Sequence, residues 1–134
     1  MGDKKMINVI VTTHGQLAQG LKDSVRMLSG EHENIHYISF MEEKGIDDLR
    51  EQFKEVIKEI SDENQWLILC DILGGSPFKI ASEFSFNNEN VSVYYGVNLP
   101  LTIQALMSRE GITLQELKNV LNESITEMIG LSVI

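Results

Sequence analysis

Short apolar runs alternate with segments of helical periodicity along this chain, and this alternation constrains the fold more than any other feature. Two runs, Ile7–Val11 and Trp66–Cys70, are almost unbroken, as in central strands that are covered on both faces. A third, Ile35–Phe40, mixes polar and apolar residues and is typical of an edge strand, and a fourth spans Val91–Tyr95. Strands that alternate with helices predict an α/β fold with a largely parallel sheet.

Amphipathic segments occupy the intervals between these strands. Leu17, Leu21, Val25 and Leu28 share one face of a predicted helix over 16–28. The other predicted helices carry apolar residues from Ile46 to Ile60, begin near Pro77, span Leu99–Met107, and run from a capping box of Thr113 and Glu116 to Met128. The last residues, Leu131–Ile134, are predicted to form a very short terminal edge strand.

The composition is that of an ordinary globular protein, with 43% hydrophobic and 23% charged residues among 134. It predicts one domain over residues 1–134. The net charge of −9 argues against nucleic-acid binding and against contact with anionic lipid. An acidic surface is compatible with a basic protein partner, but acidity also serves solubility alone.

The sequence gives no sign of export or membrane insertion. No apolar run reaches the length of a membrane span, and Met1–Lys5 leads into the first strand without the apolar region of a signal peptide. The single cysteine, Cys70, lies in an apolar run and has no partner for an internal disulfide. A cytoplasmic location is therefore expected.

The residues able to do chemistry follow the predicted strands. In open α/β sheets, ligands bind beyond the carboxyl ends of the strands, where the strand order reverses. His14 lies in the segment after the first strand, Asp71 begins the segment after the third, and Gly96–Pro100 follow the fourth. With a strand order of 2-1-3-4, His14 and Asp71 would face each other across the crevice.

A histidine that faces a carboxylate is suited to phosphoryl transfer. One ring nitrogen can attack phosphorus while the other donates to the carboxylate, which fixes the tautomer and orientation of the ring. The glycines Gly74 and Gly75 let backbone N–H groups approach phosphate oxygens, and Ser76 at the following helix start adds a hydroxyl. None of the three loops contains Lys or Arg, which favours transient transfer over nucleotide binding. No metal or cofactor is expected.

Each of these residues also has a purely structural interpretation. A histidine after a strand is commonly a cap or a surface residue, and a Gly-Gly-Ser-Pro run is commonly a turn into a helix. Asp71 could begin that turn through its side-chain oxygen. The residues alone therefore predict a site and leave its reaction open.

Three motifs resemble those of one protein family. His14–Gly20 resembles the HGxxAxG phosphorylation motif of the mannose-family IIA proteins of the bacterial phosphoenolpyruvate-dependent sugar phosphotransferase system. Asp71–Pro77 is similar to the DxxGG[ST]P loop of that family, and Gly96–Pro100 to its GxNLP segment. The three motifs occur in order and with matching spacing, and the resemblance extends from about Ile7 to the C-terminus.

The resemblance implies a phosphocarrier. His14 would accept a phosphoryl group from the carrier protein HPr as a covalent phosphohistidine and pass it to a IIB subunit, which serves the membrane permease subunits. Asp71 would orient His14 through Nδ1 and leave Nε2 to carry the phosphate, while Ser76 would contact it. The family often has Asn where this chain has Lys79, a departure that alters the contacts around the loop.

The resemblance also implies a three-layer, doubly wound, flavodoxin-like sheet of order 2-1-3-4, and a homodimer in which the short C-terminal edge strand pairs with the partner's sheet. Two other functions remain open. One is the phosphocarrier subunit of a phosphotransferase-dependent dihydroxyacetone kinase, against which Gly15 and the Gly96–Pro100 segment argue. The other is a flavodoxin-like module that binds a ligand without chemistry.

Overall fold

A parallel sheet of four strands forms the centre of the computed structural model, which describes residues 5–134. The strands are β1 (Asn8–His14), β2 (Ile35–Phe40), β3 (Trp66–Cys70) and β4 (Val91–Tyr94). They lie in the order β2-β1-β3-β4, and every neighbouring pair is parallel, which confirms the predicted topology. The prediction made for Met1–Lys4 lies outside the described residues.

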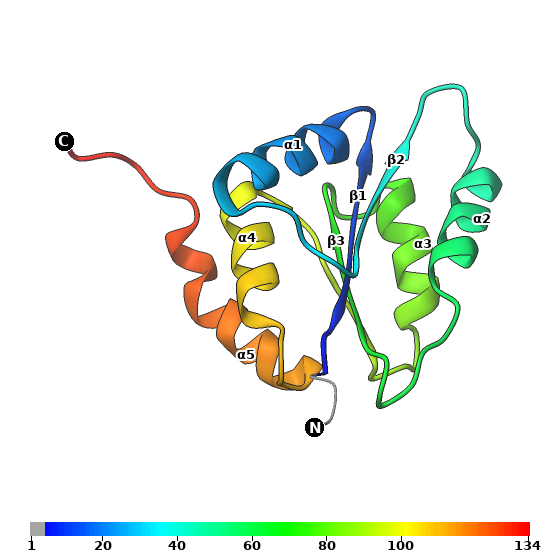
Figure 1. Cartoon of the computed structure of the whole chain (residues 1–134). Coiled ribbons are helices and arrows are strands. Elements are labelled where there is room, and N and C mark those ends of the chain that lie inside the picture. Colours follow the sequence, from blue (N-terminus) through cyan, green and yellow to red (C-terminus); the bar gives the residue numbers. More distant parts are fainter. Residues whose placement is uncertain (1–4) are drawn as a thin grey trace.

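Helices cover both faces of the sheet and make it the middle of three layers (Figure 1). One face carries α1 (Leu17–Ser29), α4 (Leu99–Ser108) and α5 (Leu114–Ser124), and the other carries α2 (Ile46–Val56) and α3 (Ser76–Ser85). A turn of 3₁₀ helix, η1 (Ile125–Glu127), follows α5. Within residues 5–134, no helix combines the length and apolar character that crossing a bilayer requires.

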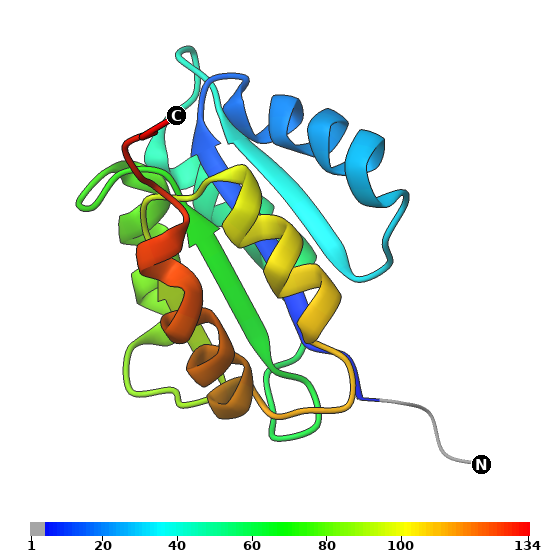
Figure 2. The ribbon, with the colours of Figure 1, turned by 90° about the vertical axis from the view of Figure 1, so that its left-hand side faces the viewer.

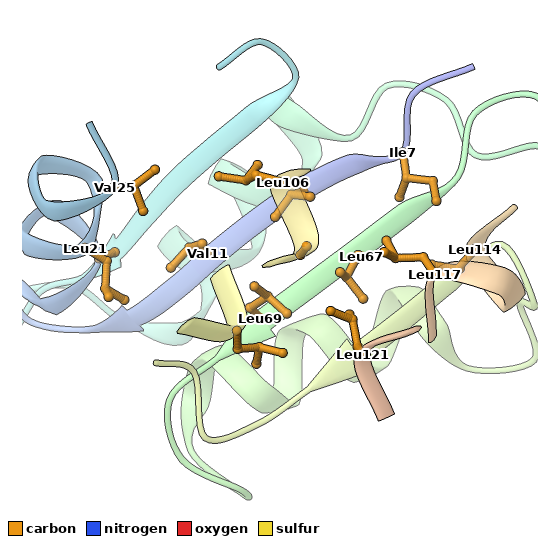
Figure 3. Close-up of a cluster of buried hydrophobic side chains, with 14 residues drawn as sticks. Ile7, Val11, Leu21, Val25, Leu67, Leu69, Leu106, Leu114, Leu117 and Leu121 are labelled. Carbon is orange, nitrogen blue, oxygen red and sulfur yellow. The ribbon is translucent and has the colours of Figure 1, made fainter. Parts of the chain in front are cut away.

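The alternation of side chains along β1 assigns each residue to one layer. Val9 and Val11 are fully buried in a cluster with residues of α1, α4 and α5 (Figure 3). Ile10 points to the opposite face and packs with residues of α2 and α3. Because the side-chain period of a strand is two, His14 lies on the same face as Ile10, toward α3.

The first strand is longer than its apolar run predicted. The ladder with β2 continues past Val11, with Thr13 opposite Ser39 and His14 opposite Phe40. Two β-branched threonines favour the extended backbone that carries the ladder this far. His14 is therefore the last residue of the strand and not a residue of the following loop.

Two helices are shorter than predicted. Helix α2 ends at Val56, and the chain then turns so that the carbonyl of Glu59 accepts hydrogen bonds from the Trp66 indole and the Asn64 amide. Ile60 still packs on the core, but from outside a helix. Helix α5 ends at Ser124, and the 3₁₀ turn η1 replaces the last helical turn predicted up to Met128.

The predicted terminal edge strand is absent from the described chain. Residues 131–134 have no ladder partner, and Leu131, Val133 and Ile134 are almost fully exposed. The tail extends away from the sheet beyond α5 (Figure 1), and it leaves at the end of the molecule toward which the β3 arrow points (Figure 2). A strand forms only where a neighbouring backbone completes its hydrogen bonds, and no strand among residues 5–134 pairs with the tail.

A buried arginine ties together the amino ends of the strands. Arg109 follows α4 and is 2% exposed. Its guanidinium donates to the carbonyls of Ile7 at 3.1 Å and Asn34 at 2.7 Å, and to the carbonyl of Glu33. Burial lowers the pKa of Arg109 from its ordinary value, and nearby acidic groups oppose that shift. Sequence analysis did not single out this residue.

Candidate functional site

His14 lies at the carboxyl end of β1 with its imidazole partly open to solvent. The side chain is 44% exposed. Its ring meets the ring of Phe40, the residue opposite it on β2, edge to face at a centroid distance of 5.8 Å. The backbone beyond is fixed by the Gly15 N–H, which donates to the Phe40 carbonyl at 2.8 Å. The strand ladder and this turn therefore hold the ring in a defined place.

Asp71, the first residue after β3, binds His14 twice through one oxygen. Its Oδ2 lies 2.9 Å from His14 Nδ1 and accepts the His14 backbone N–H at 2.8 Å. Its Oδ1 accepts the backbone N–H of Ile72 at 2.9 Å. The carboxylate side chain is only 10% exposed. The structure thus brings together His14 and Asp71, the two side chains that the sequence predicted to face each other.

The charge state of Asp71 determines the tautomer of His14. Burial acts to raise the pKa of Asp71, but the hydrogen bonds from the His14 backbone, the His14 ring and the Ile72 backbone outweigh it, so the pKa lies below its ordinary value. An ionised carboxylate only accepts hydrogen bonds. Nδ1 therefore carries the proton, and in the neutral ring the lone pair is on Nε2.

Gly75 packs directly against the imidazole. A Cβ atom at this position would lie 2.7 Å from His14 Cε1, closer than real carbon atoms approach, and 3.4 Å from Nε2. Only a residue without a side chain leaves room for the ring while it is bound to Asp71. The sequence predicted this glycine as a backbone that approaches a phosphate, and the structure shows that it also approaches the histidine.

Gly75 is also the N-cap of α3, so the ring lies at the start of a helix. No side chain caps this helix, and its first residues are Ser76 and Pro77. Within residues 5–134, the Ser76 hydroxyl makes no hydrogen bond. Gly74 has a φ of +84°, which favours glycine, and the turn closes with the Gly75 N–H on the Ile72 carbonyl at 3.2 Å. The helix start thus offers N–H groups and a positive dipole end beside Nε2.

The segment Gly96–Pro100 supports Asp71 from behind. The Gly96 N–H donates to the Asp71 carbonyl at 2.8 Å, and the Val97 N–H to the Cys70 carbonyl at 3.0 Å. Asn98 caps α4 by accepting the Leu101 N–H at 2.9 Å. The Gly96–Pro100 motif therefore has a structural role, because it fixes the backbone of Asp71.

Thr13 is a supporting residue that sequence analysis missed. Its buried hydroxyl accepts the Ala18 N–H at 2.7 Å and so fixes the start of α1 directly after the histidine. A threonine five residues before an alanine carries no distinctive sequence signal. Its role appears only when the turn at Gly15 returns the chain onto the end of β1.

Apolar side chains surround this end of the sheet. Ile72 and Leu73 follow Asp71 and are 61% and 58% exposed, and Tyr95 is 57% exposed. Within residues 5–134, no three His, Cys, Asp or Glu side chains form a group that could hold a metal ion. The arrangement is a nucleophilic ring nitrogen at a helix N-terminus, inside an exposed apolar rim that is suited to contact with another protein.

The fold and this site together define a class: three-layer α/β proteins that hold a histidine–carboxylate pair against the N-terminus of a helix. The model of the family described as "PTS system fructose IIA component" matches residues 8–121. The chain belongs to this family, the IIA components of the sugar phosphotransferase system.

Curated relatives support the same assignment. The chain is 36% identical over 114 residues to the fructose-specific EIIA component of Bacillus subtilis, covering 85% of this chain and 78% of that protein. It is 34% identical over 104 residues to the mannose-specific EIIAB component of Escherichia coli K12, covering 78% of this chain but only 32% of that longer protein.

Solved structures share the fold. An EIIA component from Streptococcus agalactiae superposes with a TM-score of 0.85 at 26% identity, covering 94% of this chain and 97% of that one. A mannose/sorbose-specific IIA subunit from Enterococcus faecalis gives a TM-score of 0.84 at 23% identity, covering 96% of each chain. The predicted flavodoxin-like, three-layer architecture is thereby confirmed.

Proposed function

We propose that this protein is a cytoplasmic phosphocarrier that accepts a phosphoryl group from phospho-HPr on His14 and passes it to a IIB subunit during sugar uptake. The observation that carries the proposal is the 2.9 Å contact between His14 Nδ1 and Asp71, which leaves Nε2 beside the start of α3. Membership of the IIA family supports the donor and the acceptor.

The chemistry follows from this geometry. The Nε2 lone pair attacks phosphorus, a new N–P bond forms, and the donor's P–N bond breaks with its electron pair returning to the donor nitrogen. The Nδ1 proton stays between His14 and Asp71, and the carboxylate stabilises the positive charge on the phosphorylated ring. The backbone N–H and the hydroxyl of Ser76, at the start of α3, bind the phosphoryl oxygens. The second transfer reverses these bond changes toward the IIB histidine.

Incubation with phosphoenolpyruvate, the first phosphotransferase enzyme and HPr tests this proposal. We expect an acid-labile phosphoryl adduct on the wild-type protein and at least a 100-fold loss of adduct in His14→Ala, because the nucleophile is gone. The matched control is His32→Ala, which removes a histidine that instead contacts the Ser29 hydroxyl at 2.8 Å. The absence of an adduct on the wild-type protein, or its persistence in His14→Ala, would refute the proposal.

The acceptor separates sugar uptake from its nearest alternative. The phosphorylated protein should lose its phosphoryl group to a IIB subunit and not to a subunit of a dihydroxyacetone kinase. Transfer to the kinase subunit alone would assign the protein to that system.

We also propose that the protein is a homodimer. The exposed tail at residues 131–134 has no ladder partner in the part of the chain that the structure describes, and β4 is an edge strand of the sheet. Pairing of each tail with the partner's β4 would complete both. Sedimentation of the full chain and of a variant ending at Gly130 tests this: loss of the dimer on truncation is expected, and an unchanged dimer contradicts the pairing.

A further inference from the structure

Lys79 lies one helical turn beyond the glycine that contacts the imidazole. Its backbone N–H donates to the Gly75 carbonyl at 2.9 Å, the first hydrogen bond from residue i to residue i−4 in α3. Residues four apart lie above one another on the same side of a helix, separated by about one pitch of 5.4 Å. Gly75 lies against the His14 imidazole, and Lys79 is exposed on the turn of α3 that follows it.

The direction of a helical side chain brings the ammonium group closer still. Side chains in α-helices lean toward the helix N-terminus and cover the turn that precedes their own Cα. For Lys79 the preceding turn is the start of α3, where Gly75 and Ser76 lie. From this position, the flexible four-carbon stem is long enough to extend toward the space in front of Nε2.

Lys79 has no competing partner. Glu83 would be its natural partner four residues on. Glu83 is instead held by Arg50 of α2, with Nε–Oε1 and Nη2–Oε2 distances of 2.8 Å each. Lys79 is exposed, and within residues 5–134 its ammonium forms no hydrogen bond or ion pair.

The site needs a cation of its own. Phosphorylation would place a group of charge close to −2 beside the Asp71 carboxylate, in a protein whose net charge is already −9. The loops that form the site contain neither Lys nor Arg. Other charged side chains at this end include Glu42, Glu43 and Lys44 in the loop between β2 and α2, and Asp47 and Asp48 in the first turn of α2, all exposed.

We propose that the ammonium group of Lys79 contacts the phosphoryl group on His14 Nε2 and stabilises the phosphohistidine. This inference rests on the proposed phosphocarrier function. Lys79 is then a catalytic residue, because it touches the group being transferred, and it supplies charge that the backbone N–H groups of α3 supply only in part. An asparagine at this position, which the resemblance makes the usual residue, would donate a hydrogen bond without the charge.

The test uses phosphoramidate as a small phosphoryl donor, so that no protein interface affects the result. Nε2 takes the phosphoryl group, the P–N bond of phosphoramidate breaks, and ammonia leaves with the electron pair. The ³¹P NMR shift of the phosphohistidine is then followed against pH. In Lys79→Gln we expect the pKa of the phosphoryl group to rise by about 0.5 unit relative to wild type, because the neighbouring cation that favours the dianion is lost.

Two further variants decide the interpretation. Lys79→Arg should restore the wild-type titration, since it keeps the charge on the same side of α3. Lys44→Gln removes the same charge at the same end of the molecule and should shift the titration clearly less. Equal shifts in Lys79→Gln and Lys44→Gln, or no shift in either, would overturn the inference while the HPr-dependent adduct on the wild-type protein upholds the phosphocarrier function. The absence of that adduct would overturn both.

Discussion

The two ends of the sheet treat polar groups in opposite ways. At the amino end, the Asn8 amide donates to Asn64 at 2.8 Å, the Gln65 side chain bonds Asn90 and the Leu114 N–H, and Arg109 is enclosed by carbonyls. At the carboxyl end, His14 stays partly exposed, Nε2 faces a bare glycine, and the start of α3 has no side-chain cap. The amino end pairs most of these polar side chains within the protein, with the buried Arg109 Nε an exception among residues 5–134, and the carboxyl end leaves a ring nitrogen free to react.

This difference separates stability from reactivity. Substitutions at the amino end should lower the free energy of unfolding and leave the chemistry of the folded protein intact. Substitutions at the carboxyl end should lower the rate of phosphoryl transfer and change stability little. Each of the following predictions would support this division of roles between the two ends if it holds, and contradict it if it fails.

The largest effect is expected at Arg109. Arg109→Leu removes a buried guanidinium that donates to three backbone carbonyls, so the free energy of unfolding should fall by about 3 kcal/mol. Urea denaturation measures this loss. Arg26→Leu is the matched control, since that arginine is exposed and its guanidinium pairs with the exposed Asp23, and it should leave the midpoint unchanged. The transfer rate per folded Arg109→Leu molecule should equal that of wild type, and a lower rate would couple the two ends.

The next effect is expected at Gly75. Gly75→Ala places a Cβ 2.7 Å from His14 Cε1, so the ring must leave its position against Asp71. Misplacing a reacting atom by about 1 Å costs roughly 100-fold in rate, and we expect a loss of phosphoryl acceptance of that order. The rate of phosphoryl transfer from phospho-HPr, measured in reactions that are quenched at a series of times, gives this loss. Gly20→Ala in α1, where a Cβ meets no atom within 4 Å, should react at the wild-type rate. Equal rates in both variants would show that the contact is irrelevant.

The smallest effect is the acid dependence of stability at Asp71. Because the folded pKa of Asp71 lies below its ordinary value, its stabilisation is complete above about pH 4 and is lost as the pH falls through the folded pKa. At pH 7, Asp71→Asn should cost about 1 kcal/mol. Urea titrations at a series of pH values should show the wild-type and Asp71→Asn curves converging toward acid. Parallel curves would contradict this. Arg109 stays protonated over this pH range, so its contribution to stability does not fall as the pH falls.

The architecture and the centre of the site could be predicted because their signals are local. The apolar runs Ile7–Val11 and Trp66–Cys70 identify central strands from composition alone. His14 and Asp71 follow those runs, and parallel strands bring their carboxyl ends to one edge. The local sequence pattern was therefore enough to predict that the two side chains lie close together.

The parts that sequence did not predict depend on contacts between distant segments. An arginine after a helix is ordinarily a surface residue, and Arg109 is buried only because carbonyls 75 to 102 positions away converge on it. The contact of Gly75 with the imidazole depends on how β1 and α3 meet, which no motif records. The apolar residues 131–134 predicted a strand, but a strand also requires a neighbour that this chain does not provide.

The position of His14 on the face of Ile10 has a consequence for how genes of this kind can change. A single codon inserted or deleted between Ile10 and His14 would turn the imidazole through the sheet, toward α1 and α4 and away from Asp71. Two codons would restore the side but move the ring past the end of the ladder with β2. Insertions and deletions are therefore not tolerated in this strand, although surface loops can accept them. A protein that keeps the reaction must keep the spacing between Ile10 and His14.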